Sequence, residues 1–222
     1  HPLELIIFTN EEGGVFGSRA LAGKLNNDAL EIKTASGFTN GEGVDRLGGN
    51  QKRIFEVTKS SNDYHAFVEL HIEQGNILNK NHIDIGVVTH GQGLNWIQVT
   101  ITGRESHTGS TPMPMRKNAG LGMAKITELV QEIAMSHQPA AVGGIGQCDV
   151  YPNSRNIIPG KVVFTIDFRS PSFDVQEDME TRLYSEATKI AKDLDLEIEF
   201  EKVGHFDPVT FDETCVNTVR KA

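Results

Sequence analysis

The sequence has few cysteines, few basic residues and no long apolar run. Its two cysteines, Cys148 and Cys215, are too few for a disulfide framework, and such usage is typical of a reducing cytoplasm. No apolar run approaches the roughly 18 residues that a membrane-spanning helix needs. The 21 basic residues are outnumbered by 30 acidic ones, for a formal charge of -9, which repels phosphate backbones and anionic lipids. We therefore expect a cytoplasmic protein that binds neither nucleic acid nor membrane.

Apolar material is sufficient for a globular core, since 38% of the 222 residues are hydrophobic. The first apolar run, at residues 3–8, is nearly continuous, as in a parallel-sheet strand buried on both faces. Residues 66–72 and 83–88 predict further strands, and residues 15–25 predict a helix. A parallel sheet needs more strands than these, so we expect a fragment of a larger α/β fold.

A different pattern begins near residue 92. Alternating apolar residues predict strands, and apolar residues at helical spacing predict two helices, the second opening with a capping box at Asp174 and Glu177. The order is βαββαβ, that of a ferredoxin-like plait with two helices on one face of a four-stranded antiparallel sheet. The predicted fold class is therefore α/β: a partial parallel-type sheet with helices in 1–91, an inserted ferredoxin-like domain in 92–204, and a return to the first domain in 205–222.

Several side chains could carry chemistry. Glu11 and Glu12 follow the first predicted strand, where open α/β sheets collect ligands. They are either metal-binding carboxylates or a solvated turn. His71 ends an apolar run and is either a metal ligand or a hydrogen-bonded core residue. Taken singly, none of the three residues decides between these interpretations.

Three more candidates lie in the second predicted domain. His107 stands among hydroxyl residues ahead of a helix, a setting suited either to polarising a carbonyl or to capping. Asn156 lies in the tight turn before Pro159 and Gly160 and fits the role of a turn residue. Arg169 either clamps a carboxylate or pairs with Asp167 on its own strand.

The joint and ordered occurrence of five motifs narrows these alternatives. The sequence resembles the hydantoinase/carbamoylase family of binuclear metal amidohydrolases, which includes N-carbamoyl-L-amino-acid hydrolases, β-ureidopropionases and allantoate amidohydrolases. The resemblance spans essentially the whole chain and is most specific in the His-Ile-Glu-Gln-Gly and His-x-Gly-x-Thr-Pro segments. The motifs are Asn-Glu-Glu-Gly at 10–13, His-Ile-Glu-Gln-Gly at 71–75, His-Thr-Gly-Ser-Thr-Pro-Met at 107–113, Asn-Ile-Ile-Pro-Gly at 156–160 and Asp-Phe-Arg at 167–169.

The resemblance implies a metal centre with two divalent ions per subunit in the intact enzyme, of zinc, manganese or cobalt. It implies that Glu11 is the general base, and that Glu12 and His71 are metal ligands. The family's other ligands have no counterpart in these 222 residues, and the segment after Gly13 is shorter than the family pattern. We expect the metal site of this sequence to be incomplete or absent, and the isolated 222 residues to be inactive.

The resemblance also implies roles for residues that contact a small substrate with a free carboxylate. Gln74 would contact the substrate, His107 and Asn156 would hold and polarise the ureido carbonyl, with His107 taking a catalytic part, and Arg169 would bind the carboxylate. In this family the ferredoxin-like domain is a lid that also forms a homodimer, so some of these residues would serve the neighbouring subunit. The implied reaction converts N-carbamoyl-L-amino acids to amino acid, CO2 and ammonia. The alternatives are allantoate or N-carbamoyl-β-alanine as substrate, or a dimerisation or ligand-binding module without enzymatic activity.

Overall fold

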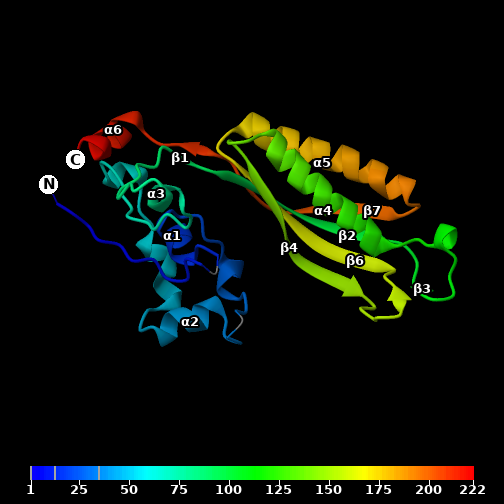
Figure 1. The fold of residues 1–222 in the computed structure, drawn as a ribbon. Helices are drawn as coiled ribbons and strands as arrows, with labels where there is room; N and C mark the ends of the chain where they lie inside the picture. Colours follow the sequence, from blue (N-terminus) through cyan, green and yellow to red (C-terminus); the bar gives the residue numbers. More distant parts are fainter. Residues whose placement is uncertain (1, 13, 35) are drawn as a thin grey trace. The chain divides into compact units, whose positions relative to one another are not determined.

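The computed structural model describes residues 2–12, 14–34 and 36–222, so Gly13 of the first motif lies outside the described residues. The chain divides into two compact units, His1–Ile72 and Glu73–Ala222 (Figure 1). Each is described by itself. The domain boundaries expected at 91/92 and 204/205 remain predictions.

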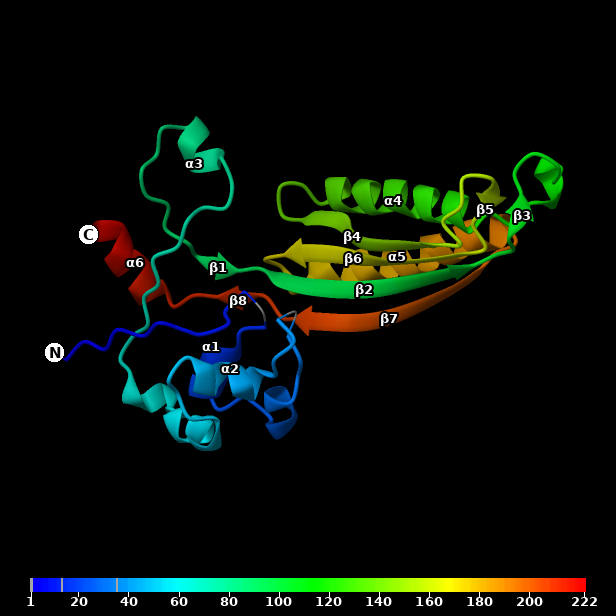
Figure 2. The same ribbon diagram turned by 90° about the horizontal axis from the view of Figure 1, so that it is seen from below.

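The larger unit contains a four-stranded sheet with two long helices on one face, as Figure 2 shows. The neighbouring strands run in the order β4-β6-β2-β7, and all three pairings are antiparallel. Along the chain the elements follow the βαββαβ order that the sequence predicts. They are β2 (Gly93–Thr102), α4 (Ala119–Ser136), β4 (Val142–Tyr151), β6 (Lys161–Ser170), α5 (Phe173–Asp193) and β7 (Glu197–Phe206).

The core of this unit lies between the sheet and the helices. Every second residue of β2 and β6 points into it, and α4 and α5 contribute apolar residues spaced three or four apart. The N-cap of α5 is Ser172, two residues before the predicted capping residue Asp174: Ser172 accepts the N–H of Val175, and Asp174 lies within the first turn. The largest fully buried apolar side chains of this core include Phe164, Phe168, Ile97, Ile101, Ile126, Ile133, Ile166, Met179 and Leu183.

Shorter elements surround the sheet. Two of them are two-stranded ladders: β1 (His90–Gly91) pairs with β8 (Val209–Thr210), and β3 (Ser106–His107) pairs with β5 (Ile157–Ile158). The others are α3 (Ile77–Lys80), η4 (Met113–Met115) and the predicted terminal helix α6 (Glu213–Lys221). Among the described residues, no helix is long and apolar enough to cross a membrane.

The smaller unit is built from short helices. These are α1 (Phe16–Leu21), η1 (Asn27–Leu30), α2 (Asn40–Arg46), η2 (Gln51–Val57) and η3 (Ser61–Asp63). A small core of Phe16, Ala20, Leu25 and Ala29 holds them together. Many other apolar side chains of this unit are exposed, among them Leu47, Phe67 and Val68.

The strands predicted at 3–8, 66–72 and 83–88 are absent, so the prediction of a partial parallel sheet is wrong for the described residues. Residues 2–8 and 66–72 form no ladder, and Leu3, Leu5 and Leu70 are each at least 89% exposed. A strand is stable only when its backbone N–H and C=O groups pair with a neighbouring strand. The described residues supply no such neighbour, so apolar side chains alone do not produce a sheet here.

Tyr184 on α5 offers a test of the packing between α5 and β7. Its hydroxyl donates to Glu180 Oε1 at 2.7 Å, and its ring packs edge-on against Phe200 with 4.8 Å between the ring centroids. Burial, and then the bond to Glu180, raises the pKa of Tyr184 above its ordinary 10.0. The folded state thus holds this proton more tightly than the unfolded state, and the resulting stability is present below pH 10 and lost as pH rises further.

We therefore expect Tyr184→Phe to have a lower Tm than wild type at about pH 8. The difference in Tm between the two proteins should narrow above about pH 10. Thermal unfolding followed by circular dichroism measures both. Because Lys202 shares Glu180, the comparison is repeated in a Lys202→Met background, which removes the titration of that lysine. A gap that stays constant or widens with pH contradicts the assignment.

Candidate functional site

The glutamate turn, residues 9–15, leads into α1. Asn10 adopts a left-handed conformation, with φ of 50°, and its side-chain amide donates to Asn40 Oδ1 at 3.1 Å. The N–H of Val15 donates to the carbonyl of Glu11 at 3.0 Å. The side chains of Glu11 and Glu12 are exposed. The turn thus presents two adjacent carboxylates to solvent on a backbone that hydrogen bonds hold in place.

Gly17 allows α1 to approach this turn. A Cβ at Gly17 would lie 2.8 Å from the backbone nitrogen of Thr9 and 3.3 Å from the Cα of Phe8. The N–H of Gly17 also donates to the carbonyl of Thr9 at 3.0 Å. The backbone ahead of the glutamates is therefore packed directly on the first turn of the helix.

We expect Gly17→Ala to destabilise the smaller unit by about 1–3 kcal/mol, since a backbone, unlike a flexible side chain, cannot easily yield to the methyl group. Gly43→Ala in α2 is the matched control, because nothing lies within 4 Å of its Cβ, and there alanine should stabilise by about 0.4–1 kcal/mol. Native-state hydrogen exchange of the α1 and α2 amides measures both effects. Equal protection in the two variants contradicts the proposed packing.

His71 and Gln74 lie on irregular backbone. His71 is exposed, and its Nδ1 is 2.6 Å from the carbonyl oxygen of Ile72. Glu73, which lies between His71 and Gln74 in the sequence, caps α3: its carboxylate accepts hydrogen bonds from the N–H groups of Ile77 and Leu78 at 2.7 and 3.1 Å. Gln74 is exposed, with a φ of 52°. The strand predicted at 66–72, which would have fixed the direction of the His71 side chain, does not form.

The described ranges, which omit residues 1, 13 and 35, contain no group of three His, Cys, Asp or Glu side chains placed to hold a metal ion. Glu12 and His71 belong to the same compact unit and have the donor chemistry of zinc, manganese or cobalt ligands. Two such donors do not fix a catalytic ion, which commonly has three protein ligands. The carboxylate and imidazole therefore fit a metal centre in kind but do not complete one.

His107 and Asn156 are brought together by the ladder of β3 and β5. His107 pairs with Ile157, and the N–H of Thr108 donates to the carbonyl of Asn156 at 2.9 Å. The Asn156 side chain is exposed and accepts a hydrogen bond from Ser154 Oγ at 2.9 Å. Two motifs nearly fifty residues apart in sequence thus lie on neighbouring backbone segments, with His107 on β3 and Asn156 directly before β5.

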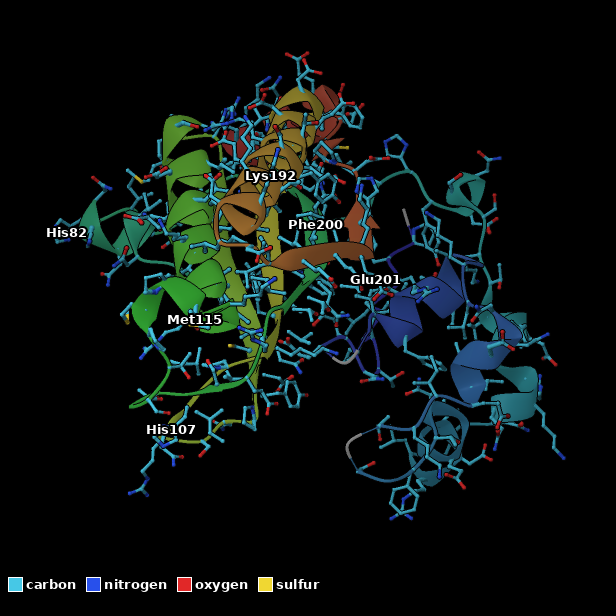
Figure 3. All side chains as sticks on the ribbon, turned by 90° about the vertical axis from the view of Figure 1, so that its right-hand side faces the viewer. His82, His107, Met115, Lys192, Phe200 and Glu201 are labelled. Carbon is cyan, nitrogen blue, oxygen red and sulfur yellow. The ribbon has the colours of Figure 1, made fainter. Side chains whose placement is uncertain are left out.

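The loop after His107 sets the state of its ring. The N–H groups of Gly109 and Ser110 donate to His107 Nδ1 at 3.0 and 3.2 Å. A ring nitrogen that accepts hydrogen bonds carries no proton, so the neutral imidazole has its proton on Nε2. Figure 3 shows His107 on the loop at the end of the sheet, below Met115. The side chain is exposed, and Nε2–H is available as a donor to a substrate oxygen.

Arg169 lies at the far end of β6 and is engaged by its own strand. Its Nε and Nη2 donate to both carboxylate oxygens of Asp167 at 2.8–3.1 Å, and this bond raises the pKa of Arg169. Of the two alternatives that the sequence leaves open, pairing with Asp167 is the one observed. The guanidinium still has the N–H groups of Nη1 to offer a carboxylate.

Arg169 and the His107–Asn156 pair occupy opposite ends of the sheet. Asn156 and β5 precede the first residue of β6, Lys161, and Arg169 follows eight residues later. At roughly 3.4 Å per residue, this strand alone separates them by about 27 Å. A small substrate cannot span that distance, so within one chain these residues do not share a site.

Arg116 belongs to none of the five sequence motifs, yet its guanidinium donates to the carbonyls of Thr108 and Thr111 in the loop after His107. The signal was available: a loop rich in Gly, Ser, Thr and Pro leaves carbonyl oxygens that need donors, and an arginine stands a few residues further on. What the sequence lacks is the direction of that side chain.

Known proteins resemble the chain over its whole length. The sequence model of peptidase family M20/M25/M40 matches residues 1–222. The chain is 49% identical over 225 residues to N-carbamoyl-L-amino-acid amidohydrolase from Rhizobium meliloti, covering 100% of this chain and 54% of the relative. It is 34% identical to N-carbamoyl-L-amino acid amidohydrolase from Geobacillus stearothermophilus, covering 100% of this chain and 55% of that one.

Solved structures give the same result. A hydantoinase/carbamoylase family amidase from Burkholderia multivorans matches with a TM-score of 0.80 and 41% identity, over 92% of this chain and 49% of its own. A hydantoinase/carbamoylase family amidase from Burkholderia ambifaria matches with a TM-score of 0.83 and 32% identity, over 97% of this chain and 53% of its own. The chain spans about half the length of these relatives. With its mixed α/β fold and a family match over residues 1–222, the chain belongs to peptidase family M20/M25/M40.

Proposed function

We propose that this chain carries part of the machinery of a metal-dependent amidohydrolase that cleaves the ureido C–N bond of N-carbamoyl-L-amino acids. The observation that supports the proposal is the His107–Asn156 pair: the β3–β5 ladder brings their backbones together, the N–H of Thr108 donates to the carbonyl of Asn156, and both side chains are exposed. The sequence relatives named N-carbamoyl-L-amino-acid amidohydrolase support this substrate class, since they are 29–49% identical over the whole chain. The relatives named allantoate amidohydrolase or ureidoglycolate hydrolase are 30–31% identical.

The reaction adds water to the ureido carbonyl and breaks the C–N bond to the terminal nitrogen, which leaves as ammonia. The remaining carbamate loses CO2 and gives the free amino acid. Glu11, exposed on the glutamate turn, takes the proton of the attacking water on its carboxylate and returns it to the departing nitrogen. His107 donates its Nε2–H to the carbonyl oxygen as negative charge develops there.

Glu12 and His71 are proposed as ligands of a two-metal centre that residues outside this sequence complete. Two divalent ions, when bound, supply a water of lowered pKa and stabilise charge on the attacked carbonyl. The exposure of Glu12 and His71 leaves both side chains available for such a role. For the isolated 222 residues we expect no turnover, since two ligands do not hold a catalytic centre.

Gln74 and Arg169 are proposed to contact the substrate, with Arg169 binding its free carboxylate through Nη1 while Asp167 holds the rest of the guanidinium. The end-to-end separation of Arg169 from the His107–Asn156 pair supports a homodimer in which each sheet domain serves as a lid. One protomer would supply Arg169 to a site, and the neighbouring protomer would supply His107 and Asn156.

The β4 edge of the sheet supports such a dimer. This strand pairs with β6 on one side only, and Asp149 is its single charged residue. An unpaired strand edge with little charge is a template for pairing with another chain. A shallow groove runs beside it along α4, lined by Ala124, Thr127, Glu128, Val130, Gln131, Gly143, Gly144 and Ile145.

Ammonia release by the full-length enzyme tests the proposed function. N-carbamoyl-L-amino acids, N-carbamoyl-β-alanine, allantoate and ureidoglycolate are compared, each with and without chelator. We expect chelator-sensitive release that is fastest from an N-carbamoyl-L-amino acid, and about two divalent ions per subunit. A protein that binds no metal and hydrolyses none of these compounds is a dimerisation or ligand-binding module. Faster turnover of one of the other three compounds reassigns the substrate.

A further inference from the structure

Arg116 spans the loop that follows His107. It comes directly after η4 and is half-buried. Its Nη2 donates to the carbonyl of Thr108 at 2.6 Å, and its Nε donates to the carbonyl of Thr111 at 3.0 Å. The two carbonyls stand at the two ends of a four-residue segment, so one guanidinium fixes both ends.

The segment between those carbonyls contains the groups that hold the His107 ring. The N–H groups of Gly109 and Ser110 both donate to Nδ1. The N–H of Thr111 donates to the carbonyl of His107 at 3.1 Å and closes the turn. Any change in the path of residues 108–111 therefore moves the two donors that select the ring tautomer.

We infer that Arg116 is a positioning residue for His107. By fixing residues 108–111, it keeps Nδ1 occupied as an acceptor and directs Nε2–H away from the loop, toward substrate. The catalytic consequence rests on the proposed function, in which Nε2–H polarises the ureido carbonyl. The effect on the ring itself rests only on the hydrogen bonds described above.

Lysine cannot replace Arg116 in this role. The guanidinium is a planar, rigid fork that donates along separate directions from Nε and Nη2, whereas an ammonium is a point donor on a flexible stem. Gly109 is the second constraint on the ring, because a Cβ there would lie 3.2 Å from His107 Cε1 and 3.5 Å from Nδ1. The ring is thus held by two backbone donors on one side, and a side chain at Gly109 would press on it and require it to shift.

Nitrogen NMR of the histidine rings in the full-length enzyme tests the positioning directly, with His107→Asn used to assign the signal. In wild type we expect one protonated nitrogen, Nε2, and one unprotonated nitrogen, Nδ1. In Arg116→Met and Arg116→Lys the two tautomers should exchange, which averages the two signals. Arg104→Met is the matched control, because the Arg104 guanidinium donates to the carbonyl of Met115, outside residues 108–111, and the substitution should leave the His107 signals unchanged.

Kinetics of the same variants test the consequence. We expect kcat of Arg116→Met to fall about 10- to 100-fold, as expected when a reacting group is misplaced, with KM changed by less than about threefold. Gly109→Ala, which disturbs the ring while keeping Arg116, should lower kcat in the same way and provides a second route if Arg116→Met does not fold.

These outcomes distinguish the positioning role of Arg116 from the proposed function. A wild-type ring signal in both Arg116 variants overturns the positioning role, whatever the activity. Averaged ring signals with unchanged kcat also overturn it, since the ring then needs no fixed orientation. If wild type shows the single tautomer but hydrolyses no ureido compound, the proposed function fails while the control of the ring by Arg116 stands.

Discussion

Replacing Glu11 by Gln in the full-length enzyme is expected to lower kcat by about 10²- to 10⁴-fold, which corresponds to roughly 3–5 kcal/mol of barrier. An amide of the same shape cannot accept the proton of the attacking water. Because Glu11 is assigned to proton transfer and Glu12 to metal binding, Glu11→Gln should retain its metal and Glu12→Gln should lose it. Ammonia release and metal content measure the two effects.

Glu31→Gln is the matched control, since Glu31 is also exposed and belongs to the same unit, and it should leave kcat unchanged. Near-normal turnover by Glu11→Gln removes Glu11 from the role of general base. Loss of metal from Glu11→Gln instead exchanges the roles of the two glutamates.

The second large effect concerns stability. Phe168→Ala is expected to destabilise the larger unit by about 3–5 kcal/mol, because removing a buried phenyl ring leaves a cavity that its surroundings fill only in part. Phe168 is fully buried on β6, where it faces Gly143 of β4. A Cβ at Gly143 would lie 2.5 Å from the phenyl ring, so the small residue on one strand accommodates the large one on the next.

Urea unfolding followed by the fluorescence of Trp96 measures this effect, since the chain's single tryptophan lies on β2 of the same sheet. Phe173→Ala is the matched control: Phe173 is 53% exposed at the start of α5, and its loss should cost less than about 0.5 kcal/mol. Equal midpoints for the two variants contradict the packing of the core described here.

Local sequence patterns were sufficient to predict the four-stranded sheet and the two long helices of the larger unit. Residues such as Ile97, Val99 and Ile101 alternate along β2, and their order of burial follows from the strand period alone. The long helix α4 is likewise fixed by apolar residues at helical spacing. Short connections then let consecutive elements pack on one another, so the order of elements leads directly to the observed sheet.

The same reasoning failed for the smaller unit, because apolar character does not provide a pairing partner. Residues 3–8 have the composition of a buried strand, yet they form no ladder and Leu3 is 98% exposed. Backbone pairing depends on a second strand, which may come from any distance in sequence. The proposed metal ligands Glu12 and His71 follow such segments, and their convergence stays a prediction for that reason.

Within the candidate site, residue identity could be read from the sequence, whereas hydrogen bonding could not. The motifs predict that His107 and Asn156 are functional, and the β3–β5 ladder places them on adjacent strands. The tautomer of His107 depends on two backbone N–H groups, and the loop path depends on Arg116. Backbone donors carry no sequence signature, so these features required the structure.

The two borders of the four-stranded sheet have opposite character. While β4 has one charged residue, β7 carries Glu197, Glu199 and Glu201 at alternate positions, all exposed. If two copies join through β4, a strand bearing three carboxylates lies at each extremity of the combined eight-stranded layer. Further copies would then bring like charges face to face, which opposes pairing. In such a dimer, growth by strand addition would stop after one step, and the formation of fibres would be disfavoured.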